Sequence, residues 1–448
     1  MHDQQLTKAL LNLPKNAREL IVDHIFVPSF LTALGFELME RIPQYSTGNG
    51  ADAVDYALRH NTQDDVFLNT KSNPYLLLEL KGKDINLTEG SGQYKSTVQQ
   101  IKRYLLAPKC KTAQWGIITN SYHIQLFRKH GKVIYPATAC LEITKDNLIQ
   151  IVQKIKDKID NTPRALTVTV YNNKGGVGKT TTTVNLAASL TLVGKKVLII
   201  DFDPNQQDLT QSLGIKPGKE NFYACLKGKQ DQVNIKDVIC SYKKFPKAEK
   251  KEFIFDVIPV DNQLAKKDED ELRKEVKASR FRQLLKTLKH EYDYILVDVP
   301  PNWRFFSSSA VYASDVILIP TKHNNIFSLE NAAVAIKEYI VDVQQKRQDG
   351  GPIALPIFFN GERTTAAQKN NTNQVITSII ERTRKEDKFD LLPYFYPRYT
   401  KAKRNQHIFE LPSHANISNA AFSRIPAVYK DKTARAYYSQ LAKEYFLQ

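Results

Sequence analysis

Residues 172–181 read Asn-Asn-Lys-Gly-Gly-Val-Gly-Lys-Thr-Thr, and they decide what kind of fold surrounds them. The apolar, β-branched run 166–171 precedes this stretch, and the segment 180–193 follows it with helical periodicity. A strand, a glycine-rich turn and a helix in that order predict a phosphate-binding loop, because glycines let backbone N–H groups turn towards a polyphosphate at a helix N-terminus. We expect Lys179 to reach the β- and γ-phosphates and the Thr180 hydroxyl to bind Mg²⁺.

The loop departs from the usual phosphate-loop pattern at its first glycine. Position 173 is Asn where G-x-x-x-x-G-K-[S/T] would begin, and an additional lysine, Lys174, follows it. The resulting K-G-G-V-G-K-T resembles the deviant Walker A signature of the ParA/MinD family of dimeric ATPases. The resemblance implies that Lys174 acts in catalysis by reaching across a dimer interface to the partner's nucleotide. It also implies that ATP is bound by Gly175, Gly176, Val177, Gly178, Lys179, Thr180 and Thr181.

The composition is that of a soluble globular protein with room for two domains. The chain has 448 residues, of which 42% are hydrophobic and 25% charged. Its formal net charge is +17, from 64 basic and 47 acidic residues. Such an excess attracts polyanions, so we expect a nucleic acid partner, DNA first. A basic protein without such a partner is the alternative.

Cysteine usage and hydropathy indicate a cytoplasmic protein without a membrane partner. The four cysteines lie far apart and form no C-x-x-C pair, which favours reduced thiols over disulfides or a zinc site. The first residues lack the pattern of a signal peptide, and no window approaches the roughly 18 apolar residues of a membrane span.

A boundary between two domains is expected near residue 160. The segment 146–159 has helical periodicity, and Asn-Thr-Pro-Arg at 161–164 breaks it. We therefore place one domain at 1–160 and a second at 161–448.

Two predicted strands of the first domain carry charged residues. Asp55 lies in 53–58, and Glu79 and Lys81 lie in 75–82. Because residues i and i+2 of a strand point to the same face, Glu79 and Lys81 project together. Two carboxylates that hold Mg²⁺ beside a lysine suit phosphodiester hydrolysis, since the metal lowers the pKa of its bound water and the lysine can position that water.

This pattern resembles the PD-(D/E)xK nucleases, especially the N-terminal regions of type I restriction motor subunits and RecB-like nucleases. The resemblance implies a separate α/β restriction-endonuclease-like domain in which Asp55 and Glu79 bind metal and Lys81 assists catalysis. Glu19, on the first predicted helix at 17–34, stands where these nucleases often place another acid. Gln100 and Tyr104 fit their Q-x-x-x-Y motif and share a helix face, so both are predicted to face DNA. A DNA-binding module without catalysis is the alternative.

The second half of the chain predicts an α/β domain with a mostly parallel sheet flanked by helices. From residue 166 onward apolar strands alternate with helices. The strand at 196–200 leads into Asp201 and Asp203, and a later apolar strand ends at Asp298. The carboxyl ends of strands in such sheets face the crevice where nucleotides bind. We expect Asp298 to hold Mg²⁺ through water, opposite Thr180.

The run Asp201-Phe202-Asp203-Pro204 resembles the second motif of the ParA family, D-x-D-P-Q. The resemblance implies that Asp203 orients or activates the attacking water and that Asp201 supports the metal site. Asn205 stands where the family usually has Gln.

Later segments extend the resemblance over roughly 165–448. Further central strands are predicted at 316–321 and 357–360, and Asn360 is a candidate contact for adenine. The segment 417–429 resembles the carboxyl-terminal loop of the family, which lies near the nucleotide base.

A basic run near the C-terminus is the candidate DNA-binding surface. ParA proteins bind DNA without sequence preference when dimerised by ATP, so the resemblance implies phosphate contacts from this run. A solvated charged face is the alternative. The basic residues are Arg398, Lys401, Lys403 and Arg404.

Three functions remain open at this point. The first is an ATP-dependent, dimerising, DNA-binding ATPase of plasmid or chromosome partition, found on the nucleoid or plasmid and aided by a ParB-type adaptor. The second is an ATP-gated, Mg²⁺-dependent DNA endonuclease that defends against foreign DNA. The third is a nucleotide-sensing scaffold without catalysis, and it ranks last because the ATPase motifs are complete.

Overall fold

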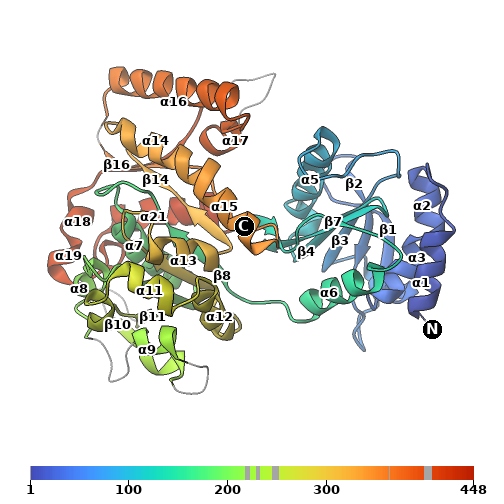
Figure 1. The fold of residues 1–448 in the computed structure, drawn as a ribbon, viewed down its shortest axis with the longest axis horizontal. Helices are drawn as coiled ribbons and strands as arrows, with labels where there is room; N and C mark the ends of the chain where they lie inside the picture. Colours follow the sequence, from blue (N-terminus) through green and yellow to red (C-terminus); the bar gives the residue numbers. More distant parts are fainter. Residues whose placement is uncertain (1, 217–221, 229–232, 245–251, 363, 398–405) are drawn as a thin grey trace. The chain divides into compact units, whose positions relative to one another are not determined.

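The chain folds as two compact units (Figure 1). Unit 1 comprises Met1–Thr162 with Gln348–Gly351 and Gln448, and unit 2 comprises Pro163–Arg347 and Pro352–Leu447. The computed structural model describes residues 2–216, 222–228, 233–244, 252–362, 364–397 and 406–448.

Unit 1 contains a mixed sheet with strand order β1-β2-β3-β4-β5-β6, and β7 pairs with β5. Strands β3 and β4 are parallel, and the other neighbouring pairs are antiparallel. Helix α5 (Gly92–Leu105) lies in the crossover between β3 and β4. The strands are β1 (Arg41–Ser46), β2 (Ala53–Leu58), β3 (Leu76–Leu80), β4 (Trp115–Thr119), β5 (His123–His130), β6 (Val133–Pro136) and β7 (Leu141–Glu142).

Both faces of strand β3 are covered, so it is buried along its whole length. Leu76, Leu78 and Leu80 belong to a core shared with the N-terminal helices and α6. Leu77 belongs to a second core that includes residues of α5. The helix predicted at 17–34 is two helices, α2 (Glu19–Ile25) and α3 (Val27–Ala33), because a proline at the start of α3 has no N–H to continue the preceding turn. The other helices of unit 1, besides α5, are α1 (His2–Leu11), α4 (Phe67–Thr70) and α6 (Leu148–Asp160).

The predicted α/β architecture of the second half is confirmed. Unit 2 has a seven-stranded sheet of order β10-β11-β9-β12-β8-β13-β15, parallel except for the pair β10–β11. The strands are β8 (Leu166–Val170), β9 (Val197–Asp201), β10 (Cys240–Lys244), β11 (Phe253–Ile258), β12 (Tyr294–Asp298), β13 (Val316–Leu318) and β15 (Ile353–Ala354).

Helix α7 (Lys179–Leu192) lies between the sheet and a further helix. It contacts β8, β9, β11 and β12, and α21 (Lys432–Tyr445) packs against it. Every residue from Thr182 to Leu190 is buried as a result. The helix that follows the loop is therefore fixed from two sides.

A smaller parallel sheet has the order β14-β16-β17, with β14 (Pro320–Thr321), β16 (Phe358–Glu362) and β17 (Phe409–Pro412). The prediction of central strands at 316–321 and 357–360 is therefore wrong in part. The first segment divides between two sheets because Pro320 has no N–H with which to continue the ladder of β13. The second segment belongs to the small sheet.

The remaining helices of unit 2 surround the two sheets (Figure 1). A π-helical turn, Ala335–Tyr339, joins α14 to α15. The helices are α8 (Asp208–Leu213), α9 (Phe222–Lys227), α10 (Asn262–Ala265), α11 (Glu269–Glu275), α12 (Ser279–Leu288), α13 (Phe305–Ala313), α14 (Ile326–Val334), α15 (Ile340–Arg347), α16 (Ala366–Glu386), α17 (Leu392–Phe395), α18 (Ala415–Ser418), α19 (Ala420–Ser423) and α20 (Ala427–Lys430).

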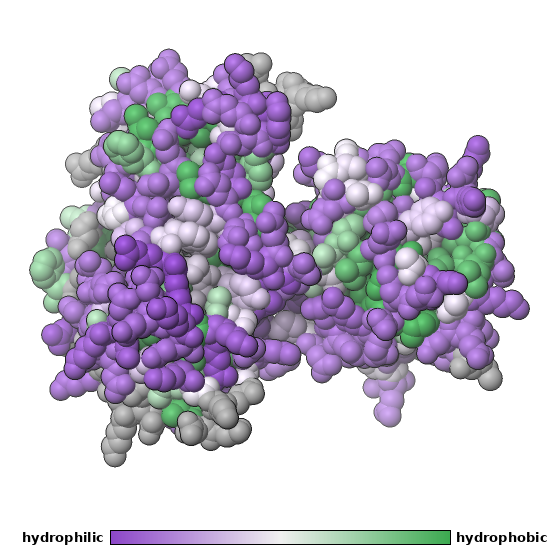
Figure 2. Space-filling view, in the orientation of Figure 1, coloured by the Kyte–Doolittle hydropathy of each residue, from purple (hydrophilic) through white to green (hydrophobic). Residues whose placement is uncertain are grey.

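The face shown in Figure 2 is mostly hydrophilic, with separate apolar patches. Among the described residues, no helix is both long enough and apolar enough to span a membrane.

Removing the buried carboxylate of Asp315 should destabilise unit 2. Asp315 accepts hydrogen bonds from the Thr167 backbone N–H (2.9 Å) and from Lys289 Nζ (2.8 Å). We expect Asp315→Ala to lower the free energy of unfolding by about 3 kcal/mol, since it leaves Lys289 without its buried partner. Urea unfolding followed by Trp303 fluorescence, in a Trp115→Phe background, measures this loss. The control is Asp342→Ala, which breaks an exposed pair with Lys346 and should cost about 0.5 kcal/mol. Equal losses in the two variants would contradict the prediction.

Candidate functional site

The predicted loop connects the end of β8 to the start of α7. Gly176 and Gly178 have positive φ angles of 74° and 83°, a conformation that favours glycine. A Cβ atom added at Gly175 or Gly176 would meet no atom within 4 Å. The loop therefore borders open space in front of the helix N-terminus, which suits a bound polyphosphate.

The start of the loop is held by side-chain amides. Asn172 Nδ2 donates to the carbonyl oxygens of Pro320 (2.9 Å) and Ser328 (3.0 Å), and Asn331 Nδ2 donates to the Asn173 carbonyl oxygen (3.3 Å). The first residues of the loop are thus joined to β14 and α14. Asn172 was not among the predicted site residues, although a polar residue after an apolar strand is a usable signal.

The two lysines of the loop lie in different surroundings. Lys179 is only 8% exposed, and its Nζ donates to the Lys174 carbonyl oxygen (3.3 Å). Burial lowers the pKa of Lys179, against the effect of Asp298 and Asp203. Lys174 instead places its Nζ 5.8 Å from the ring centroid of Phe327. The side chain of Lys179 is therefore the one held inside its own loop.

Asp298 and Thr180 form the candidate metal site. Thr180 Oγ1 donates to Asp298 Oδ2 (2.6 Å), whereas Asp298 Oδ1 is buried without a hydrogen-bond partner among the described residues. Burial, together with the nearby Asp201, raises the pKa of Asp298 to about 8. A divalent cation prefers oxygen ligands of this kind and would stabilise the ionised carboxylate. The donor set therefore fits Mg²⁺.

Asp201 is fixed by Thr210 rather than directed at solvent. Its Oδ2 accepts from the backbone N–H (2.9 Å) and Oγ1 (2.6 Å) of Thr210, and burial raises its pKa to about 6. Thr210 lies on α8, nine residues further along the chain, and nothing in the sequence indicated this role. Asp201 pairs with Asp298 in the register of β9 and β12, so the two acids are neighbours.

Asp203 lies in the turn after β9. Its Oδ1 accepts from the backbone N–H groups of Asn205 (3.2 Å) and Gln206 (3.1 Å). Burial raises the pKa of Asp203, although these hydrogen bonds and Lys179 oppose the shift. The structure thus brings Asp203 to the same edge of the sheet as the loop, and its action on water stays a prediction.

Asn360 holds the loop from the small sheet. Its Nδ2 donates to the Val177 carbonyl oxygen (2.8 Å) and to Thr182 Oγ1 (3.2 Å). The same nitrogen lies where a Cβ atom on Gly178 would point. The amide nitrogen is therefore engaged within the protein, and a contact of Asn360 with adenine stays a prediction.

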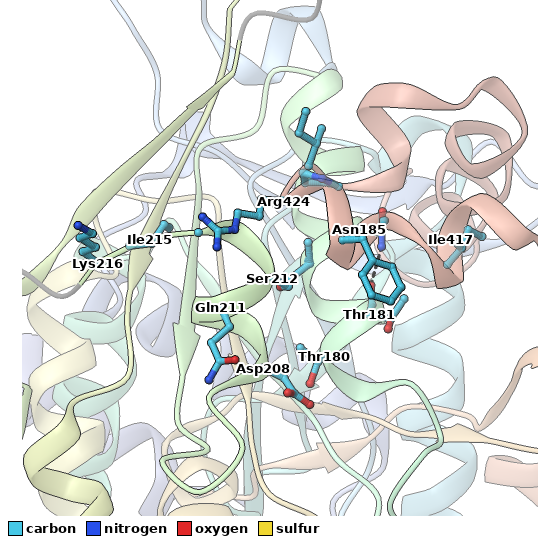
Figure 3. Close-up of a pocket in the computed structure, with 16 residues that line it drawn as sticks. Thr180, Thr181, Asn185, Asp208, Gln211, Ser212, Ile215, Lys216, Ile417 and Arg424 are labelled. Atoms are coloured by element: carbon cyan, nitrogen blue, oxygen red, sulfur yellow. Dashed lines mark hydrogen bonds between the residues drawn. The ribbon is translucent and has the colours of Figure 1, made fainter.

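A cavity of about 740 Å³ lies beside the first turn of α7 (Figure 3). Thr180 and Thr181 line it, together with residues of α8 and of the segment 417–426. The C-terminal segment that was expected near the nucleotide is therefore close to the loop helix.

Unit 1 brings its predicted acids and lysine together. Lys81 Nζ donates to Glu79 Oε1 (2.5 Å) and lies 3.8 Å from Glu19 Oε2. Asp55 Oδ2 accepts from the Leu80 backbone N–H (2.7 Å). Burial, together with the nearby Asp55, raises the pKa of Glu79 to about 7, against the opposing effect of Lys81.

The geometry of this second site leaves its metal role untested. Among the described residues, no group of three or more His, Cys, Asp or Glu side chains is arranged to hold a metal ion. Glu79 Oε1 already accepts from the ammonium group of Lys81. Metal binding by Asp55 and Glu79 therefore stays a prediction.

The prediction that both Gln100 and Tyr104 face DNA is wrong for the tyrosine ring. Tyr104 is 4% exposed and packs in the core with Ile101 and Leu105, since these neighbouring residues share the buried side of α5. Its hydroxyl accepts a hydrogen bond from Gln100 Nε2 (2.9 Å). The predicted DNA contacts at Arg398, Lys401, Lys403 and Arg404 lie outside the described residues.

A methyl group at Gly178 should weaken nucleotide binding. Gly178→Ala adds strain at positive φ and pushes on Asn360, so we expect the Kd for ATP to rise at least about tenfold. Isothermal titration calorimetry measures this change. Gly194→Ala, at the other end of α7, is the matched control because it has a similar φ of 79° and open space around it. The control should lose stability but keep its ATP affinity, and equal affinities in both variants would refute the role of the loop.

Comparisons with known proteins place the second half of the chain in a family. A family model described as an AAA domain matches residues 165–349. The sporulation initiation inhibitor protein Soj of Bacillus subtilis is 31% identical over 283 residues, which cover 62% of this chain and 96% of that protein. The chromosome partitioning protein ParA of Myxococcus xanthus is 32% identical over 156 residues, 34% of this chain and 50% of that protein.

A solved structure of the cell division ATPase MinD from Pyrococcus furiosus aligns at 21% identity with a TM-score of 0.42, over 62% of this chain and 98% of that one. The match to Soj covers nearly the whole of that relative, and the loop described above carries the additional lysine at its start. The chain belongs to the ParA/MinD family of P-loop ATPases.

Proposed function

We propose that this ATPase binds MgATP at the loop, dimerises in the ATP state and binds DNA without sequence preference, in the partition of plasmids or chromosomes. The observation that carries the proposal is the loop itself. It has one buried lysine and a second lysine that lies over Phe327. Its Thr180 hydroxyl donates to Asp298, whose other carboxylate oxygen is buried without a partner among the described residues.

The residues of the loop have distinct roles in this proposal. The backbone N–H groups of the loop and the Lys179 ammonium bind the β- and γ-phosphates and offset their charge. Thr180 and Asp298 hold Mg²⁺, which when bound neutralises charge that develops on the phosphate oxygens. Asp203 orients the attacking water, and Asp201 keeps the acidic edge in place through its hydrogen bonds with Thr210.

DNA binding is supported by charge and by the relatives. The net charge of +17 favours phosphate contacts that depend on salt and not on sequence. The names of the related proteins from Myxococcus xanthus and Treponema pallidum refer to chromosome partitioning. We include in the proposal a DNA-bound adaptor of ParB type and a location on the nucleoid or a plasmid.

Loss of the Lys174 side chain should abolish the ATP-dependent dimer. We expect Lys174→Ala to remain monomeric with ATP but still to bind the nucleotide, because its ammonium lies over Phe327 and not in its own loop. Light scattering after size-exclusion chromatography, with Mg²⁺ and a non-hydrolysable ATP analogue, measures the mass. Lys195→Ala, just after α7, is the control and should dimerise normally. A Lys174→Ala dimer would refute the cross-interface role.

We propose DNA cleavage as a second function of unit 1. The supporting observation is a cluster of four residues: Glu19 of α2, Asp55 of β2, Glu79 of β3 and Lys81 just after β3. Burial is the largest cause of the raised pKa values of Glu79, Asp55 and Glu19, and Asp55 adds to the shifts of Glu79 and Glu19, so the cluster favours a cation. In this alternative the protein is an ATP-gated endonuclease, because the ATP-dependent dimer would pair two such clusters.

Cleavage should require Mg²⁺ and Glu79. We expect the full chain to nick or linearise supercoiled plasmid with Mg²⁺ and ATP, and Glu79→Ala to lose this activity. Agarose gel electrophoresis measures the products. Glu142→Ala, an exposed acid on β7 of the same unit, is the control and should cleave normally. Intact plasmid under every metal and nucleotide tested would leave unit 1 without a nuclease function.

A further inference from the structure

Lys174 lies against an aromatic ring that the fold leaves in solvent. Its Nζ is 5.8 Å from the ring centroid of Phe327, within the range at which an ammonium is attracted to the face of a ring. Phe327 is 68% exposed, and its neighbour Ile326 is 50% exposed. The position of this ring is therefore not explained by packing in a core.

The backbone under this ring is fixed to the loop. Asn325 caps α14 by accepting from the Ser328 backbone N–H, and Asn172 donates to the Ser328 carbonyl oxygen (3.0 Å). Asn331, one turn further along α14, donates to the Asn173 carbonyl oxygen (3.3 Å). The first turn of α14 thus presents Phe327 at a set place beside the residue that precedes Lys174.

Electrostatic repulsion and attraction both favour the position of the Lys174 ammonium over the Phe327 ring. Lys179 Nζ is bound to the carbonyl oxygen of Lys174, so a second ammonium within the loop would be repelled by the first. The negative face of the Phe327 ring offers the Lys174 ammonium a place outside the loop. A long lysine side chain held in this way also loses less conformational freedom when it forms its final contact.

We propose that Phe327 is a positioning residue for Lys174, holding its ammonium at the mouth of the loop in the orientation from which it reaches the nucleotide of a second copy. This inference rests on the proposed ATP-dependent dimer. Phe327 itself touches neither nucleotide nor metal in this proposal. Its effect is on the population of Lys174 conformers that are ready to cross the interface.

Variants of Phe327 in the full chain test this role. Phe327→Ala and Phe327→Leu should raise the protein concentration needed for half-maximal dimerisation about two- to fivefold, the effect expected of an exposed cation–π contact. Phe327→Tyr and Phe327→Trp keep a ring and should dimerise like the unmodified chain. The measurement is sedimentation velocity over a concentration series, with Mg²⁺ and a non-hydrolysable ATP analogue. The Kd of the monomer for that analogue should stay unchanged in all four variants.

The controls distinguish an effect of the Phe327 ring from an effect of exposed apolar surface in general. Ile326→Ala removes exposed apolar surface from the same turn and should leave dimerisation unchanged. If Phe327→Leu behaves like the unmodified chain, or if Ile326→Ala weakens the dimer as much as Phe327→Ala, the positioning role is refuted. An unmodified chain that stays monomeric overturns the proposed function and this inference together. A dimer that is lost in Lys174→Ala but forms in Phe327→Ala at the same protein concentration as in the unmodified chain overturns this inference alone.

Discussion

The site depends on the register of three adjacent parallel strands. Asp298 at the end of β12 pairs with Val170 at the end of β8 on one side and with Asp201 at the end of β9 on the other. All three strands are buried at every position, so this register cannot shift without moving apolar residues out of the core. The loop after β8 and the acids at the ends of β9 and β12 are therefore brought to one edge of the sheet by this register.

The same edge contains groups that a protein selected only for stability would avoid. A buried carboxylate oxygen on Asp298 has no hydrogen bond from the described residues, and the buried ammonium of Lys179 donates to a backbone carbonyl. Each such group costs free energy of folding, on the order of 1–3 kcal/mol for an unsatisfied polar atom. The groups that cost stability at this edge are therefore the ones that the proposed Mg²⁺ and phosphate would satisfy.

Sequence reasoning succeeded where a local pattern carries the information. The apolar strands, the glycine loop and the acids at strand ends are contiguous signals, and the structure places Lys179, Thr180, Asp201 and Asp298 together. It failed where a distant residue decides the outcome. The partners of Asn172 and Asn360 lie more than 140 residues away, and the burial of Tyr104 follows from how α5 packs on its sheet. The division of 316–321 between two sheets follows from Pro320. The sequence shows that a proline interrupts the strand, but it does not show that the residues after it join another sheet.

The hydrogen bonds of Asn360 connect the loop, through the small sheet, to the last helix of the chain. Asn360 belongs to β16, which pairs with β17, and β17 contacts α21. Helix α21 also packs on α7, whose first residue is Lys179. These contacts lead from the loop through β16, β17 and α21 back to α7, which begins at the loop. We therefore expect a change of loop backbone at Val177 or Gly178 to be accompanied by a shift of the small sheet and of α21, because Asn360 and α7 join the loop to both.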